Sequence, residues 1–346
     1  RSTPSNSSAA SDVYKRQIET IRNLLSSKPF KGRKVVCSLP SRELLIQHLR
    51  VSKMDEEQLA KALPFEAQTK VPFNISQGKL CYVVAGEVYE GSDSKLEVIL
   101  MAASGAVVAR NLSLVERTKL EVESLDVEPC ALVSCFGDLL EQAPAAAGGT
   151  MFVDLGHSCS KVLITHGRDI VFCRTLSIGA SHLLRVLSEK LDVGYKEALE
   201  LLRHMGAEQL TEPASADKYS EARAGEPDGT AAVQVAPTKA AEPAVALLAD
   251  EDDQETPKDA ALIVENNLQT LADELRGCIR YHDMMFSNQN TKRVIFVGGL
   301  SKNLYISRLL AQKLALPVQV GDPLVRLDQA TVAGPHSDLR PDEWRS

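Results

Sequence analysis

The sequence predicts a two-part α/β protein, and three observations lead to that fold class. The stretch 151–170 reads as an apolar strand, a polar turn and a second apolar strand. Nearer the other end, an apolar run closes in Gly298 and Gly299 and passes into a helical pattern. Strand-like and helical patterns also alternate on both sides of a small-residue stretch at 143–150. Such alternation is typical of sheets covered by helices.

Composition favours a folded protein of a reducing cytoplasm. The 346 residues, 44% of them hydrophobic, are enough for two buried cores. The most apolar stretch, 97–109, is shorter than the about 20 residues that span a bilayer, so no transmembrane segment is expected. Seven cysteines occur without a CxxC pair, which argues against a disulfide framework and against a zinc site.

The charge pattern argues against nucleic-acid binding. The formal charge is −7, and residues 206–260 hold 13 acidic and 4 basic side chains, so the rest of the chain is close to neutral. No basic footprint for a phosphate backbone remains. Because 206–260 is also rich in alanine and proline and poor in large apolar residues, it is expected to be a disordered insertion.

The first half begins with a segment, 1–17, that has no apolar periodicity and is expected to be a disordered, non-native tail. Native sequence is then expected to start mid-domain, near Ile18. The patterns that follow predict a helix, two strands, a helix capped by Asp55, two strands, a helix, and a strand that turns at Pro129 into a helix. These elements are expected at 18–27, 34–40, 44–54, 54–73, 79–89, 95–104, 106–120 and 125–140.

The second half repeats the order of strands followed by helices. After the strand–turn–strand at 151–170, the patterns predict a third strand, two helices, a long helix, a strand, a turn, a helix and a last strand. These are expected at 171–179, 180–190, 194–206, 261–286, 293–299, 300–303, 304–315 and 317–323, with a tail at 331–346.

The turn "DLGHSCSKV" carries the main functional signal. Asp154 closes a strand, Gly156 lets the backbone approach a ligand, and Ser158 and Ser160 add hydroxyls beside successive N–H groups. A concavity of this kind suits phosphate, which Asp154 would reach through Mg²⁺ or a metal-bound water. A hairpin without a ligand is the alternative. Cys159 is expected in the core, because it alternates with the two serines.

The second signal is "VIFVGGLSKN". Its strand ends in Gly298 and Gly299, and Ser301 or Asn303 is placed to cap the following helix. Here a backbone can pass close to a base or a phosphate. Alone, a Gly-Gly pair after a strand is a weak signal, but its combination with the DxGxSxS hairpin is much more specific.

The combination resembles the actin-like ATPase superfamily, in which two related lobes hold a nucleotide between phosphate hairpins and a Gly-Gly adenosine loop. Within it, the chain from about 18 to 325 is similar to the PilM family of type IV pilus assembly. The stretches that carry this resemblance, in family order, are "GRKVVCSLP", "MDEEQLAKALPFEAQTKVPF", "LEVILMAAS", "LDVEPCALVSC", "MFVDLGHSCSKVLI", "RTLSIGASHL", "VIFVGGLSKN" and "LALPVQVGDPL".

The resemblance implies an actin-like (ribonuclease H-like) two-lobed α/β ATPase fold. A first lobe is expected at 18–148, with a small extra α+β (SHS2-like) subdomain at about 41–105 of the kind shared with FtsA. A second lobe is expected at 149–205 and 261–330. The family begins with its own DxGxxS hairpin and none precedes Ile18, so the N-terminal strands of the first lobe are expected to be missing and ATP to bind weakly.

The resemblance also implies a set of nucleotide contacts, with ATP and Mg²⁺ as cofactors. It assigns the second phosphate loop to Asp154, Gly156, Ser158 and Ser160, the adenosine loop to Gly298, Gly299 and Ser301, and ribose contacts to Glu274 and Arg276. A solvated helix face is the alternative for the last two. Gly179 matches a turn before a helix and is explained equally well by packing.

The implied partner is the N-terminal peptide of an inner-membrane protein of the PilN type. The resemblance places that peptide in a groove bounded by Phe65, Val71 and Phe73. The alternative is that these side chains are core. The chain is then a cytoplasmic scaffold at the inner membrane, in contact with other pilus assembly components, and at most a weak ATPase with no assigned catalytic residue.

Two other functions stay open on the sequence. A small-molecule kinase of the same superfamily needs a carboxylate base aimed at an acceptor hydroxyl, and no Asp or Glu is convincingly placed for it. A GspL-like cytoplasmic domain of a type II secretion system has the same fold but continues into a transmembrane helix. His166, His182, His204 and His282 show no metal-ligand spacing and are expected to be surface or packed side chains.

Overall fold

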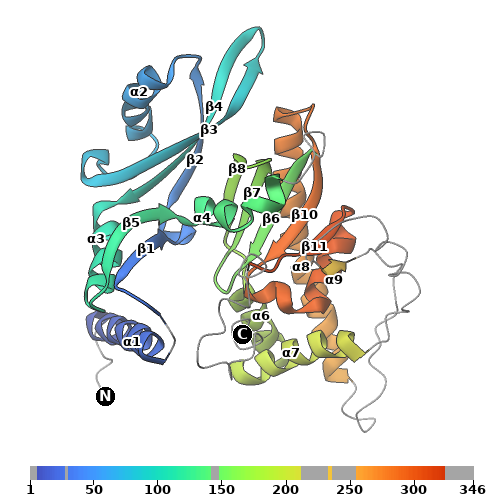
Figure 1. Ribbon diagram of the computed structural model, residues 1–346. Coiled ribbons are helices and arrows are strands. Elements are labelled where there is room, and N and C mark those ends of the chain that lie inside the picture. Colours follow the sequence, from blue (N-terminus) through green and yellow to red (C-terminus); the bar gives the residue numbers. More distant parts are fainter. Residues whose placement is uncertain (1–5, 28–29, 142–147, 212–232, 236–254, 324–346) are drawn as a thin grey trace. The chain divides into compact units, whose positions relative to one another are not determined.

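The computed structural model describes residues 6–27, 30–141, 148–211, 233–235 and 255–323 (Figure 1). The chain divides into two units. Unit 1 contains Arg1–Val83, Val98–Cys135 and Arg326–Ser346, and unit 2 contains Val84–Glu97 and Phe136–Val325. The predicted tail at 331–346 and most of the predicted insertion at 206–260 lie outside the described residues.

Unit 2 is built on a six-stranded sheet in the order β8-β7-β6-β10-β11-β9. β6, β7 and β8 are antiparallel neighbours, whereas β10 pairs in parallel with both β6 and β11. The central strands β6 and β10 are buried almost throughout, which accounts for their continuous apolar sequences. The strands are β6 Gly149–Leu155, β7 Ser160–His166, β8 Asp169–Leu176, β9 Val233–Val235, β10 Thr291–Val297 and β11 Val318–Val320.

The helices of unit 2 cover this sheet. The long helix α8 contacts β7, β8 and β10, and it also packs on α6 and α9. Its buried side chains recur at helical spacing, as expected for a helix with one apolar face: Val264, Leu268, Leu271, Leu275 and Cys278. The helices are α5 Gly137–Glu141, α6 Ala180–Leu191, α7 Tyr195–Thr211, α8 Glu255–Met285 and α9 Leu304–Leu314.

Unit 1 contains a parallel pair, β1 Lys34–Leu39 with β5 Glu121–Val127. Leu39, Ala103 and Val108 form a buried cluster beneath it. A second sheet has the order β2-β4-β3, formed by β2 Leu45–Ser52, β3 Gly78–Glu90 and β4 Asp93–Ser104. The helices are α1 Asn6–Ser27, α2 Glu56–Gln68, α3 Gly105–Glu116 and α4 Glu128–Cys135.

Residues 84–97 of the hairpin that joins β3 to β4 belong to unit 2. There the Tyr281 hydroxyl donates to a carboxylate oxygen of Glu97 at 3.3 Å. The ring of Phe286 lies against Gly86, where a Cβ would come within 3.0 Å of the ring. The predicted subdomain at about 41–105 contains these residues, and its boundaries stay a prediction.

Three expectations need correction. The expectation of a disordered tail is wrong for the described residues 6–17, which belong to α1. In this helix Ile18 is buried, and the guanidinium of Arg117 lies 5.4 Å from the centroid of the Tyr14 ring. The insertion is shorter than expected, because α7 runs to Thr211, α8 starts at Glu255, and Val233–Val235 pairs with β11. Pro129 lies inside α4, near its start, where a missing N–H costs nothing.

A pair of histidines, the buried His282 and the half-buried His166, joins α8 to the end of β7. Nε2 of His166 lies 2.9 Å from Nε2 of His282, and Nδ1 of His282 lies 2.8 Å from the carboxylate of Asp283. Burial lowers the pKa of His166 to about 4, helped by His282 and opposed by the Gln289 backbone and Asp169. Burial also lowers the pKa of His282, against the opposing effect of Asp283. Both rings are therefore packed and neutral near pH 7.

This pair predicts an acid-sensitive stability. The unfolded rings take up protons below their ordinary pKa of about 6.5 while the folded pair does not, so the free energy of unfolding should fall as the pH drops from about 6.5 towards about 4. Thermal melting at neutral and acidic pH checks it. We expect the drop in Tm on acidification to be about 3 °C or more smaller in His166→Gln than in the wild type. The exposed His204→Gln should behave like the wild type, and equal drops in all three proteins would contradict the account.

Candidate functional site

The turn between β6 and β7 is held from below by the start of α6. The backbone N–H groups of Ala180 and Ser181 donate to the carbonyls of Gly156 and His157 at 3.0 and 2.8 Å. Gly179 is required for this contact, because a Cβ there would lie 2.6 Å from the His157 carbonyl oxygen. Gly179 therefore has a packing role.

The turn presents donors on its exposed side. Within the described ranges, the backbone N–H groups of His157 and Ser158 donate to no other part of the chain, and both residues are exposed. The Gly156 N–H is already used by the Asp154 carbonyl at 3.1 Å. Two successive N–H groups and the Ser158 hydroxyl can thus bind an anion, as expected for a phosphate loop.

Ser160 has a different role from the expected one. Its side chain is fully buried, and its hydroxyl donates to the carbonyl of Ile178 at 2.6 Å. It therefore fixes the β7 end of the turn to the segment before α6 and does not face a ligand. Cys159 is buried, in agreement with the expected alternation.

The paired glycines meet the hairpin at the end of the neighbouring strand. β10 runs parallel to β6 with Val297 opposite Asp154, so the carboxyl ends of both strands lie at one edge of the sheet. Gly298 has a φ of +87°, and a Cβ on it would lie 2.2 Å from Oδ1 of Asp154 and 2.8 Å from the Leu155 carbonyl oxygen. A Cβ on Gly299 would meet nothing within 4 Å. The two sequence signals are brought together, as expected of a ligand site in an α/β sheet.

The start of α9 decides which side chain caps it. Oδ1 of Asn303 accepts from the Ile306 N–H at 3.2 Å, while Nδ2 of Asn303 donates to the Leu202 carbonyl at 2.7 Å. Ser301 is buried, and its hydroxyl donates to the Gly298 carbonyl at 2.7 Å. Asn303 is therefore the cap, and Ser301 fixes the 3₁₀ turn Gly299–Lys302 with a hydroxyl that is not available to an adenosine.

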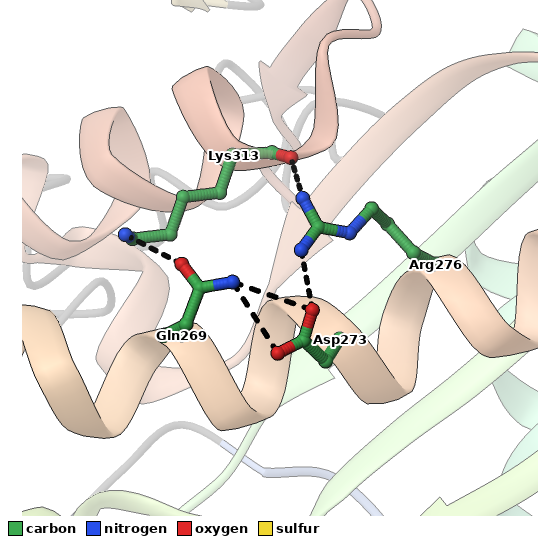
Figure 2. A network of polar contacts seen from close by, with 4 residues as sticks. All are labelled: Gln269, Asp273, Arg276 and Lys313. Atoms are coloured by element: carbon green, nitrogen blue, oxygen red, sulfur yellow. Dashed lines mark hydrogen bonds and ion pairs between the residues drawn. The ribbon is translucent and has the colours of Figure 1, made fainter.

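Glu274 and Arg276 lie on α8 but point in different directions, as residues two apart on a helix must. Glu274 pairs with Arg174 of β8 at 3.2 Å. Figure 2 shows the guanidinium of Arg276 between the Asp273 carboxylate and the Lys313 carbonyl of α9, which accepts from Nη1 at 2.8 Å. The ammonium of Lys313 donates back to Gln269 at 2.9 Å. In the described part of the chain, these ion pairs and hydrogen bonds go to residues other than Asp154 and the paired glycines, and ribose contact stays a prediction for both side chains.

The network in Figure 2 predicts a structural effect for Arg276→Ala. The variant loses a charge-assisted bond to one of the last carbonyls of α9, and because the site is partly exposed we expect a destabilisation of about 1 kcal/mol. Denaturant unfolding measures it, with the exposed Arg280→Ala on the same helix as the control. An unchanged stability together with a clear loss of ATP affinity would support the ribose contact and contradict the structural role.

The expected Mg²⁺ contact of Asp154 does not fit the side chains around it. Nζ of Lys161 lies 2.7 Å from Oδ2 of Asp154, and both side chains are only 19% exposed. No group of three His, Cys, Asp or Glu side chains that could hold a metal ion occurs in the described ranges. Sequence reasoning missed Lys161, although the register could have found it: with the turn spanning 156–159, Asp154 and Lys161 are cross-strand partners.

The three side chains predicted to bound a peptide groove in unit 1 differ in their exposure. Val71 is buried at 7% exposure, and its N–H donates to the Ala67 carbonyl at 3.0 Å, so it belongs to the core beneath α2. Phe73 is half-buried over Gly78. Phe65 is 79% exposed, on the face of α2 opposite the buried Leu63 and Ala67. Of the three predicted side chains, Phe65 is the most exposed, and peptide binding stays a prediction.

Comparison with known proteins places the chain in a family. A family model described as "Type IV pilus assembly protein PilM" matches residues 8–207, more than half of the sequence. The chain belongs to the PilM family. The family match starts inside α1, within the stretch expected to be a tail. No curated protein matches the sequence.

One solved structure supports the PilM fold, and two more distant ones are also similar. A chain of the "PilM-PilN type IV pilus biogenesis complex" is similar with a TM-score of 0.64 and 17% identity, covering 92% of this chain and 80% of that one. The ethanolamine utilization protein EutJ of Carboxydothermus hydrogenoformans follows with a TM-score of 0.40 and 16% identity over 64% and 59% of the two chains. MreB 5 of Spiroplasma citri, bound to AMPPNP, has a TM-score of 0.39 and 12% identity over 63% and 60%.

The predicted actin-like α/β fold is confirmed. Among the described residues, no helix is long and apolar enough to cross a membrane.

Proposed function

We propose that the chain is a nucleotide-binding scaffold of type IV pilus assembly. Unit 2 binds ATP at the edge of its sheet, and unit 1 binds the N-terminal peptide of an inner-membrane protein of the PilN type. The observation that carries the nucleotide part is the packing of Gly298 directly on Asp154 beside the open N–H groups of His157 and Ser158. The family match and the likeness to a PilM chain solved with PilN support the partner.

The nucleotide site, as the name is used below, consists of Asp154, the turn Gly156–Ser158 and Gly298–Gly299. The N–H groups of His157 and Ser158 donate to phosphate oxygens, with the Ser158 hydroxyl beside them. Gly299 is open on the side where a Cβ would stand, which leaves its backbone accessible to a flat base. Ser160 and Ser301 keep the two turns in place from inside the fold.

The site is suited to binding and not to chemistry. Asp154 is paired with Lys161 and is therefore poorly placed to act as a general base. This argues against the kinase alternative, which requires a carboxylate aimed at an acceptor hydroxyl. The protein is at most a weak ATPase, and it works on the cytoplasmic side of the inner membrane through its partner and other pilus assembly components.

Peptide titration tests the scaffold function. A labelled peptide with the N-terminal sequence of a PilN-type protein is titrated with the full chain, with and without ATP. We expect the peptide to bind in both cases. ATP should change its dissociation constant about threefold or more, because the coupling free energy between two binding sites typically changes affinity by about fivefold or more. Equal affinities would contradict ATP sensitivity, and the absence of binding would contradict the partner.

A further inference from the structure

Lys161 is a charged residue paired with Asp154 of the nucleotide site, and neither the sequence pattern nor the family resemblance gives it a role. It lies at the second position of β7, directly opposite Asp154 on β6. Cross-strand partners project to the same face of a sheet, so the ammonium and the carboxylate share one surface. Nζ of Lys161 lies 2.7 Å from Oδ2 of Asp154, and each of the two side chains is only 19% exposed to solvent.

The second oxygen of Asp154 is also enclosed. The place that a Cβ of Gly298 would take lies only 2.2 Å from Oδ1, so the backbone of the Gly-Gly loop closes over this side of the carboxylate. One oxygen thus faces an ammonium and the other faces the next strand end. Mg²⁺ demands near-ideal octahedral geometry and keeps several of its waters. To bind Asp154, the hydrated ion would have to displace Lys161 from a mostly buried ion pair.

The ammonium of Lys161 can bridge Asp154 and a phosphate, as was expected of Mg²⁺. It carries three N–H donors and binds more than one oxygen partner at a time. Lys161 also follows Ser160, which anchors the end of the turn whose N–H groups at His157 and Ser158 are open to an anion. Lysine is a common ligand of phosphate in proteins, where it acts as a point charge.

Resting on the proposed function, we infer that Lys161 is the cation that links Asp154 to the nucleotide phosphates, in the position where Mg²⁺ was expected. Two consequences follow. ATP binds this site without a divalent ion, and removal of the Lys161 ammonium frees Asp154 to take one, which makes binding depend on Mg²⁺.

Calorimetric titration of the full chain with ATP, in excess MgCl₂ and in excess EDTA, tests this inference. For the wild type we expect dissociation constants within about threefold of each other in the two buffers, a difference of less than about 0.7 kcal/mol. Lys161→Met should bind ATP with an affinity about tenfold or more below that of the wild type in EDTA, and MgCl₂ should restore part of this affinity. Lys161→Arg, which keeps the charge, should stay close to the wild type in EDTA.

Two controls keep the outcomes distinct. Lys190→Met removes an exposed charge from α6 and should bind ATP like the wild type in both buffers. Thermal melting of each variant shows whether Lys161→Met is folded, and if it is not, the Arg variant and the wild-type buffer comparison still decide. Wild-type binding that needs Mg²⁺ overturns the inference alone. If the wild type binds no ATP in either buffer, the proposed nucleotide function fails and the inference fails with it.

Discussion

Gly298→Ala is expected to destabilise unit 2 by about 3 kcal/mol and to weaken ATP binding more than tenfold. Gly298 adopts φ +87° and ψ 173°, a region that is essentially restricted to glycine. The added Cβ would also stand 2.2 Å from Oδ1 of Asp154, which must move together with its partner Lys161. Backbone strain and overpacking therefore act at the same point of the nucleotide site.

Gly299→Ala is the matched control for stability. A Cβ at this position meets nothing within 4 Å, so the free energy of unfolding should change by less than about 0.5 kcal/mol. Urea unfolding of the two variants measures the difference between adjacent glycines. Equal stabilities for Gly298→Ala and Gly299→Ala would show that Asp154 and Gly298 are not in contact.

Phe65→Glu is expected to weaken the affinity for the PilN-type peptide tenfold or more without unfolding unit 1. Exposed aromatic anchors commonly contribute about 2 kcal/mol or more to an interface when they become buried. Phe65 is 79% exposed, and the core of its helix is formed by Leu59, Leu63 and Ala67 on the other side. A charge at this position should therefore leave the helix intact and disrupt an apolar contact.

Fluorescence anisotropy with the labelled peptide measures this effect, and thermal melting reports on the fold. Tyr89→Glu is the control, because Tyr89 is also exposed, at 74%, but belongs to unit 2. It should bind the peptide like the wild type. Undiminished binding by Phe65→Glu would place the peptide elsewhere, and a lowered Tm would mean that Phe65 supports the core.

Much of the fold was predictable because local signals and tertiary contacts agree. Asp55 was expected to cap α2, and its carboxylate accepts from the Gln58 N–H at 2.8 Å. The apolar runs at β6 and β10 predicted strands, and the two strands are the parallel centre of the unit 2 sheet, buried almost throughout. The glycines of both turns were expected to let the backbone approach a ligand. Gly156 and Gly298 lie against other parts of the protein, where a Cβ would come within 2.7 Å of the Cys159 carbonyl oxygen and 2.2 Å of Oδ1 of Asp154, and approach to a ligand stays a prediction.

The remaining features depend on contacts between segments far apart in the sequence. Whether the hydroxyls of Ser160 and Ser301 face a ligand or a carbonyl is decided by the segments that pack behind them. Val71 follows the last turn of α2, where helical periodicity no longer says which side is buried. Composition alone suggested disorder for 6–17, yet the segment continues a helix that buries Ile18.

Hydrogen–deuterium exchange with and without ATP tests most directly whether the Asp154 turn and the paired glycines bind one nucleotide. We expect ATP to slow exchange in both short segments, 154–160 and 297–301, and to leave the exposed end of α6 near Lys190 unchanged. Protection of one segment without the other, or of neither at saturating ATP, would contradict the account.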